Sequence, residues 1–205
     1  MSATGRTPGK RHASDFYETP YPLAEATLNY VRSGFGIYAP ELILDPGAGL
    51  GVWGKAARGI WLSSPNIVGI EIGQVPIPGG PVYYDSWYHD DYLTLSQQWR
   101  NNVKTRPDLI VGNPPYRLAQ EFVEVSLRLI APGGLMAFLL RLNFLAGRRR
   151  RSFWRKHKPG HVVVLVERPS FTSDGNSDAT EYALFVWGDR FAHFVHPHID
   201  WLSWK

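Results

Sequence analysis

The sequence predicts an α/β fold with a doubly wound, mostly parallel sheet and an antiparallel strand at one edge. Short, nearly continuous apolar runs alternate with helical spacings through the first 140 residues, as expected for parallel strands buried on both faces. Each of these runs leads into a short polar or glycine-rich cluster. No helical spacing separates the last two apolar runs, so these two strands are expected to pair antiparallel.

The expected elements follow from the spacing of apolar residues. Helices are predicted after Pro20, from Trp53 and from Leu118, where apolar side chains recur three or four positions apart. A Pro- and Gly-rich stretch over residues 75–81 leads to Val82–Tyr84 and Asp91–Leu93. The expected strands cover residues 42–44, 67–70, 109–111, 135–140, 162–166 and 182–187.

Composition limits the class of protein. The 205 residues are 44% hydrophobic and 20% charged, which is typical of one globular domain. We expect a flexible basic arm over residues 1–14, followed by a single domain over residues 15–205. The absence of cysteine excludes disulfides, thiolate metal sites and cysteine nucleophiles. No apolar stretch reaches the roughly 18 residues of a membrane span, and no leader opens the chain, so a cytoplasmic location is expected.

The positive charge is concentrated in one segment. The net charge is +4, yet the stretch from Arg141 to Lys158 holds eight basic residues and no acidic one. Such a segment, inserted as a loop over residues 141–160, favours a polyanionic partner, although a solvated loop is the alternative. The interleaved Phe144, Phe153 and Trp154 favour nucleic acid, because bases offer faces for stacking. The residues expected to contact a nucleic-acid backbone are Arg141, Arg148, Arg149, Arg150, Arg151, Arg155 and Lys156.

Four clusters follow successive strands of the expected sheet. They are Asp45–Gly49, Glu71, Asp91 and Asn113–Tyr116. Ligands of open α/β sheets bind outside the carboxyl ends of the strands, so the four clusters are expected to meet in one crevice.

The first two clusters indicate a nucleoside cofactor. Asp45 precedes the turn glycines Gly47 and Gly49, where the backbone can approach a ligand closely. Glu71, 22 residues after Gly49, can accept both hydroxyls of a ribose. Residues 49–54 also satisfy GxGxxG, so a dinucleotide is the rival cofactor. The charge of Asp45 opposes a pyrophosphate but suits an ammonium and a sulfonium, which favours S-adenosylmethionine over NAD. A tight turn without a ligand is the remaining alternative.

Asn113-Pro114-Pro115-Tyr116 indicates chemistry at an amino nitrogen. The lone pair of an adenine amine is delocalised into the ring, which makes the amine a poor nucleophile. The side-chain oxygen of Asn113 and the carbonyl of Pro114 can each accept one amine hydrogen and so free the lone pair. The prolines restrict the backbone that carries both acceptors, and Tyr116 offers a flat face to a base. A proline turn without catalytic function is the alternative.

At these residues the chain resembles the class I S-adenosylmethionine-dependent amino-methyltransferases, and most closely the small phage-type DNA adenine-N6 methyltransferases. The resemblance covers about residues 16–187 and implies their Rossmann-like class I methyltransferase fold. It also implies that Phe16, Tyr17, Thr19 and Pro20 close over the methionine end of the cofactor. Asp91 would take the adenine amine of the cofactor, with Asp85 and Asp90 as alternatives, and Tyr92 would pack against that ring.

The resemblance further implies a DNA substrate whose target adenine is flipped out of the duplex and stacks on Tyr116 and Phe171. The chain has no room for a separate target-recognition domain, so residues 141–160 and 171–178, a homodimer or a partner subunit would supply recognition. A bacterial or phage-infected cell is the implied location. Methylation of an RNA base or of a protein glutamine amide, and a non-catalytic nucleic-acid-binding module, are the alternative functions.

No metal is expected to take part. His193, His196 and His198 lie close together in the sequence, but Pro197 interrupts them and no carboxylate completes a site. A solvated edge strand is the favoured interpretation of that segment.

Overall fold

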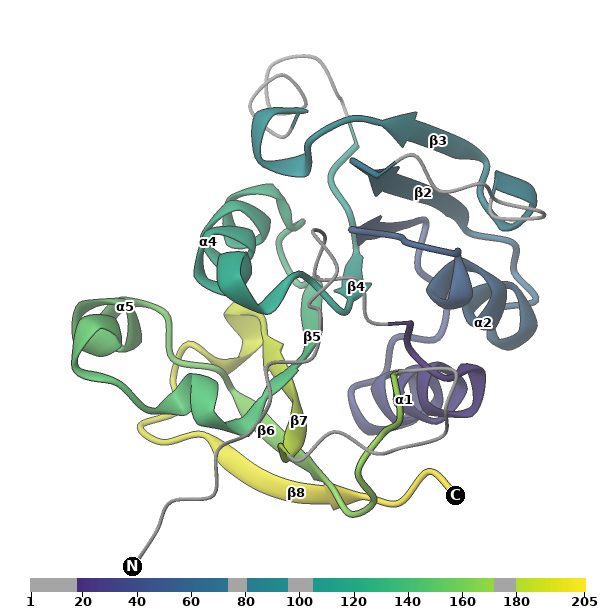
Figure 1. Cartoon of the computed structure of the whole chain (residues 1–205). Coiled ribbons are helices and arrows are strands. Elements are labelled where there is room, and N and C mark those ends of the chain that lie inside the picture. Colours follow the sequence, from purple (N-terminus) through teal and green to yellow (C-terminus); the bar gives the residue numbers. More distant parts are fainter. Residues whose placement is uncertain (1–17, 74–80, 96–104, 172–179) are drawn as a thin grey trace, which may run out of the picture.

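The computed structural model describes residues 18–73, 81–95, 105–171 and 180–205. Within these ranges the chain forms an eight-stranded sheet in the order β3-β2-β1-β4-β5-β7-β6-β8 (Figure 1). The strands are β1 (Leu42–Pro46), β2 (Asn66–Glu71), β3 (Ser86–His89), β4 (Leu109–Gly112), β5 (Leu135–Arg141), β6 (His161–Leu165), β7 (Tyr182–Trp187) and β8 (His198–Leu202). The helices are α1 (Tyr21–Gly34), α2 (Val52–Ile60), α4 (Ala119–Leu129) and α5 (Arg151–Lys156).

The pairing of the strands confirms the predicted fold class. The five strands from β3 to β5 pair in parallel, whereas β7 runs antiparallel to both of its neighbours, β5 and β6. The expected antiparallel pairing of the last two predicted strands is therefore present as β6 and β7. Strand β8 then adds in parallel to β6 at the edge, with most of its residues exposed.

Helices cover both faces of the sheet. Helices α1 and α2 pack on one face, and α4 and α5 pack on the other (Figure 1). Strand β5 shows why: Leu135, Ala137 and Leu139 belong to the core under α1 and α2, and the alternating residues belong to the other core. All six are buried, as the continuous apolar run predicted. No helix in the described ranges is both long and apolar enough to cross a membrane.

The segment before Asp91 is arranged around a buried tyrosine. Pro81–Tyr83 forms a 3-10 turn, and strand β3 begins only at Ser86. The Tyr84 ring fills a slot left by two glycines, because a Cβ at Gly54 or Gly69 would lie 2.5 Å or 2.9 Å from it. These glycines permit close approach of helix α2, strand β2 and the tyrosine.

Candidate active site

A cavity of about 370 Å³ lies at the carboxyl ends of β1, β2 and β4. It brings together residues from all four predicted clusters, from the segment just before α1 and from α4. Of the predicted site residues, those lining it are Thr19, Gly47, Gly49, Glu71, Asp91, Tyr92, Asn113 and Pro115. The convergence that the sequence predicted is therefore present in the described part of the chain. The predicted Phe16 and Tyr17, the arm over residues 1–14 and the segment 172–178 lie outside the described residues.

The glycine loop between β1 and α2 uses its backbone N–H groups within the protein. Gly47 and Ala48 both donate to the carbonyl of Ile70, over 2.8 Å and 2.9 Å, and Gly51 donates to Ala48 over 2.8 Å. Gly47, Gly49 and Gly51 all have positive φ angles, from 51° to 84°, which glycine adopts without strain. The loop is thus tied to the end of β2, and these N–H groups already have acceptors.

Glu71 connects this loop to the cavity. Its Oε2 accepts the N–H of Gly49 over 2.9 Å, and its Oε1 accepts the N–H of Gly73 over 2.7 Å. An ionised carboxylate offers about four acceptor sites, so capacity for two ligand hydroxyls remains. Glu71 lines the cavity and is half-buried.

Asp45 lies outside the lining of the cavity. It is only 1% exposed, and its Oδ2 accepts a hydrogen bond from the Tyr84 hydroxyl over 2.6 Å. That hydroxyl also accepts the N–H of Gly54 in helix α2 over 3.2 Å. Asp45 Oδ1 is buried without a hydrogen-bond partner among the described residues. Burial raises the pKa of Asp45 to about 7, the negative charge of Glu71 adds to this, and the hydrogen bond from Tyr84 opposes it.

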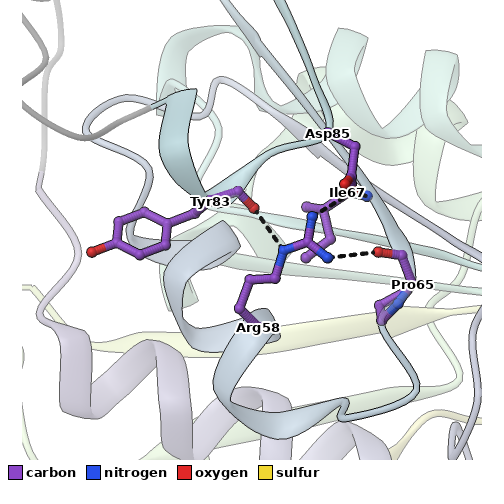
Figure 2. Close-up of polar contacts among 5 residues, drawn as sticks. All are labelled: Arg58, Pro65, Ile67, Tyr83 and Asp85. Atoms are coloured by element: carbon purple, nitrogen blue, oxygen red, sulfur yellow. Dashed lines mark hydrogen bonds and ion pairs between the residues drawn. The ribbon is translucent and has the colours of Figure 1, made fainter.

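The carboxylates before Tyr92 differ in their surroundings. Asp90 and Asp91 both line the cavity, and Asp91 caps the helical turn 92–95 by accepting the N–H of Leu93 over 2.9 Å. Asp85, the other alternative, does not line this cavity. Figure 2 shows it bound to Arg58 and to the N–H of Ile67, where it joins α2 to β2. Asp85 therefore has a structural role in the fold.

Tyr92 lies beside this pair of carboxylates. It is 2% exposed, its hydroxyl is hydrogen-bonded to Ser126 Oγ over 2.8 Å, and its ring lies 5.0 Å from that of Phe122, centroid to centroid. Both contacts are to helix α4. Tyr92 thus forms a fixed apolar wall of the cavity.

The Asn-Pro-Pro-Tyr segment leaves the end of β4 and enters a 3-10 turn that begins at Tyr116. Asn113 Nδ2 donates to Oγ1 of the buried Thr19 over 3.2 Å, which orients the amide. Asn113 and Pro115 line the cavity, whereas Pro114 is buried. Thr19 thereby links the start of α1 to the predicted catalytic segment, a contact that the sequence did not indicate.

The two aromatic residues predicted to hold a base both pack against Tyr182. The ring of Tyr116 lies 5.6 Å from that of Tyr182, and the ring of Phe171 lies 4.9 Å from it. The guanidinium of Arg141 lies 4.8 Å from the Tyr116 ring centre, and its Nε donates to the Tyr182 hydroxyl over 3.3 Å. Phe171 lines a second cavity of about 440 Å³ together with Thr19 and Pro20.

Tyr182 was missed by the sequence analysis. The sequence shows only that Tyr182 opens the apolar run 182–187, and its pairing with Arg141 becomes visible in the structure. Tyr84 was also missed, and its signal is the pair of glycines inside a helix and a strand.

The basic segment divides into inward and outward side chains. Arg148, Arg151, Arg155 and Lys156 line a shallow groove, and Arg149 is exposed. Arg150 is instead half-buried. It donates to the carbonyls of Phe144 and Ala146 over 3.3 Å and 2.8 Å, and it lies 4.8 Å from the Phe144 ring centre.

The aromatic residues of this segment correct one expectation. Phe144 and Phe153 are 4% and 3% exposed, and Trp154 packs against Phe144 and Phe185. They join the core under α4 and α5 and do not offer faces to bases, because the short helix α5 needs them to attach to the sheet.

The histidines near the carboxyl terminus form no ligand set. His198 begins β8 and stacks on His161 with ring centres 5.0 Å apart. Within the described ranges, no three histidine, aspartate or glutamate side chains are placed to hold a metal ion.

Comparison with known proteins identifies the fold. No protein-family model matches the sequence, and no curated protein sequence matches it. A Listeria monocytogenes protein described as a class I S-adenosylmethionine-dependent methyltransferase is 14% identical, with a TM-score of 0.64 over 95% of this chain and 68% of that chain. A type I restriction-modification methyltransferase subunit from Streptococcus thermophilus is 17% identical, with a TM-score of 0.61 over 84% of this chain.

The S. thermophilus match covers 45% of that subunit, so this chain corresponds to less than half of it. A Pyrococcus horikoshii protein described as an RNA methyltransferase is 14% identical, with a TM-score of 0.62 over 86% of this chain and 90% of that one. The chain therefore has the class I methyltransferase fold. At these identities, the matches assign the fold and leave activity and substrate to be argued from the site.

Proposed function

We propose that this protein transfers the methyl group of S-adenosylmethionine to the exocyclic N6 amine of adenine in DNA. The observation that carries the proposal is the shared cavity: Asn113 and Pro115 line the same space as Glu71 and Asp91. Residues suited to an amino acceptor thus adjoin residues suited to a nucleoside.

The charge of the cavity supports S-adenosylmethionine over a dinucleotide. Four carboxylates line it, from Glu18, Glu71, Asp90 and Asp91, and no lysine or arginine does so among the described residues. In the glycine loop, the N–H groups of Gly47, Ala48, Gly49 and Gly51 donate to protein acceptors. These four groups are therefore not directed at a pyrophosphate, as those of a dinucleotide fingerprint are. A cavity of about 370 Å³ falls within the usual range for small-molecule sites.

The cofactor residues take the following roles. Glu71 accepts the ribose hydroxyls, Asp91 or its neighbour Asp90 accepts the adenine amine, and Tyr92 lies against the adenine ring. Thr19 and Pro20, with Phe16 and Tyr17, stay predicted contacts to the methionine end. When bound, S-adenosylmethionine supplies an electrophilic methyl group on its sulfonium. Asp45 acts indirectly, because its carboxylate does not line the cavity and accepts a hydrogen bond from the Tyr84 hydroxyl.

Asn113 and Pro114 hold the acceptor. Because Asn113 Nδ2 is directed at Thr19, Oδ1 is the atom that accepts an amine hydrogen, and the Pro114 carbonyl accepts the other. Tyr116 and Phe171 contact the extruded base. Extrusion is required because a stacked adenine cannot reach this segment, and positioning of the amine in line with the methyl group supplies most of the acceleration.

DNA as the acceptor is supported by the basic segment after β5. Target recognition stays assigned to residues 141–160 and 171–178, to a second copy of this chain or to a partner subunit. The protein would act in the cytoplasm of a bacterial or phage-infected cell.

The test is to express the full chain in cells that lack adenine methylation and to quantify methylated nucleosides in digested DNA and RNA. N6-methyladenine in DNA that disappears with Asn113→Ala supports the proposal. Methyl groups only in RNA or on protein glutamine would replace the acceptor, and none anywhere would leave a binding module of the same fold.

A further inference from the structure

The face formed by the 3-10 turn Arg148–Arg150 and helix α5 carries a shallow groove of about 500 Å³. Its lining residues are Arg148, Arg151, Ser152, Arg155 and Lys156, and no acidic side chain of the described chain lines it. We call this surface the basic groove. The four cations and one hydroxyl are all hydrogen-bond donors suited to phosphate oxygens.

The packing beneath the basic groove fixes where its charges stand. Phe153 and Trp154, which lie between Ser152 and Arg155 in the sequence, are anchored in the core with Phe144 and Phe185. Arg150 donates hydrogen bonds to two backbone carbonyls of the residues before it, those of Phe144 and Ala146. These bonds hold the start of α5. Arg151 and Arg155, and likewise Ser152 and Lys156, are one helical turn apart and therefore share a face. The groove is thus a set of cations at defined spacing rather than a free loop.

This arrangement is unfavourable for the fold by itself. Like charges one helical turn apart destabilise a helix by a few tenths of a kcal/mol per pair, and no carboxylate in the groove offsets this. A polyanion would relieve the repulsion and release counterions. A repeated anion matches the four cations better than a single phosphate does.

The position of the basic groove relates it to the candidate active site. Strand β5 ends at Arg141, whose guanidinium lies over Tyr116, and the chain then continues directly into the groove. Helix α5 lies on the same face of the sheet as α4, which lines the active cavity through Phe122 (Figure 1).

We propose that the basic groove binds the sugar–phosphate backbone of duplex DNA while a nucleotide of the same molecule enters the active cavity. This inference rests on the proposed function for its choice of duplex DNA, and its test is separate.

The experiment measures the affinity of the full chain for a fluorescently labelled 30-base-pair DNA duplex as a function of salt. Each phosphate contact adds about 0.9 to the slope of log affinity against log salt. Arg151→Glu with Arg155→Glu is therefore expected to lower that slope by about 1.8 and the affinity near 0.1 M salt by about tenfold or more. Arg32→Glu with Arg128→Glu makes the same change of net charge at exposed positions elsewhere, and should leave the slope unchanged.

Several results would overturn the proposal. These are an unchanged slope in the groove variant, an equal loss in the matched control, tighter binding to single-stranded RNA of equal length, or binding to phosphatidylserine vesicles with none to DNA. Arg151→Gln with Arg155→Gln removes the two charges without reversing them. Circular dichroism and thermal unfolding of this variant separate a loss of DNA contacts from misfolding caused by the charge reversals.

The proposal for the basic groove and the proposed methyl transfer can be refuted independently of each other. Methylation of DNA with an unchanged slope would refute the basic groove alone. A lowered slope without any methyl transfer would retain the basic groove as a DNA-binding surface and refute the enzymatic assignment.

Discussion

The active cavity and the basic groove lie on one domain but are built in opposite ways. In the cavity, backbone geometry sets the functional groups: positive φ angles at three glycines and N–H bonds to Ile70 and Glu71 determine its shape. In the groove, side chains on a short helix provide the charges, and core aromatics hold that helix in place. The cavity is acidic and the less open of the two, and the groove is basic and shallower. Under the proposed function, the cavity would carry out the chemistry and the groove would hold the substrate.

The largest expected effect tests this division directly. Asn113→Ala should lower the turnover of methyl transfer by about 100- to 1000-fold, because a positioned transition-state partner is lost. Affinity for the cofactor, measured by calorimetry, and for DNA should change less than about twofold. Asn29→Ala, at an exposed position of helix α1, is the matched control. A variant that retained more than about a tenth of the turnover would refute the role of Asn113.

The next effect concerns the buried carboxylate behind the cavity. The pKa of Asp45 in the folded protein is about 7, above its unfolded value of 3.8. The folded state therefore binds the proton more tightly, and the corresponding stability is present at low pH and lost as pH rises from about 4 to about 7. Between pH 5 and pH 8 the free energy of unfolding should fall by about 2–3 kcal/mol.

Asp45→Asn removes this ionisation, so urea unfolding at the two pH values should show the fall in the wild type and not in the variant. Tyr84→Phe removes the hydrogen bond that lowers the pKa, and should extend the fall to higher pH. Variants of the basic groove leave Asp45 and its partner Tyr84 unchanged, so they should keep the wild-type profile. Identical pH dependence in wild type and Asp45→Asn would contradict the burial of this charge.

Glu71→Gln should weaken binding of S-adenosylmethionine by about 1–3 kcal/mol, the usual contribution of hydrogen bonds to a charged group. Calorimetry measures this, with Glu41→Gln at an exposed position as the control. NAD should bind neither the wild-type protein nor the variants, because the four carboxylates that line the cavity repel its pyrophosphate. An affinity for NAD comparable to that for S-adenosylmethionine would refute the assigned cofactor. It would also refute the functional contrast between an acidic cavity and a basic groove.

The sequence predicted the cavity better than the groove for a physical reason. Strands that are buried on both faces have continuous apolar sequences, and the glycines after β1 indicate the loop between β1 and α2. The polar clusters at the strand ends could therefore be predicted from the sequence. Strand β3 and strand β8 carry exposed residues and lack such runs. In α5, two adjacent aromatic residues stand between charged ones, and only the packing against Phe144 and Phe185 decides which side chains point inward.

Contacts between residues that are far apart in the sequence could not be predicted from it either. Nothing in the spacing connects Tyr84 with Asp45, 39 residues apart, although Gly54 and Gly69 mark a close approach. The contact between Thr19 and Asn113 spans 94 residues and depends on how α1 meets β4.

The smallest effect distinguishes two adjacent arginines within the basic segment. Arg150 donates to two carbonyls and lies over Phe144, whereas Arg149 is exposed. Arg150→Ala should therefore lower the free energy of unfolding by about 1 kcal/mol, allowing for its partial exposure to solvent. Arg149→Ala should change it by less than about 0.5 kcal/mol, as is usual for an exposed side chain. Both substitutions remove one positive charge, so net charge cannot produce a difference between them. Urea unfolding of the two variants at the same pH and salt measures it. Equal stabilities would mean that Arg150 is as solvated as its neighbour, and the turn before α5 would then have to be held by Phe144 and Phe153 alone.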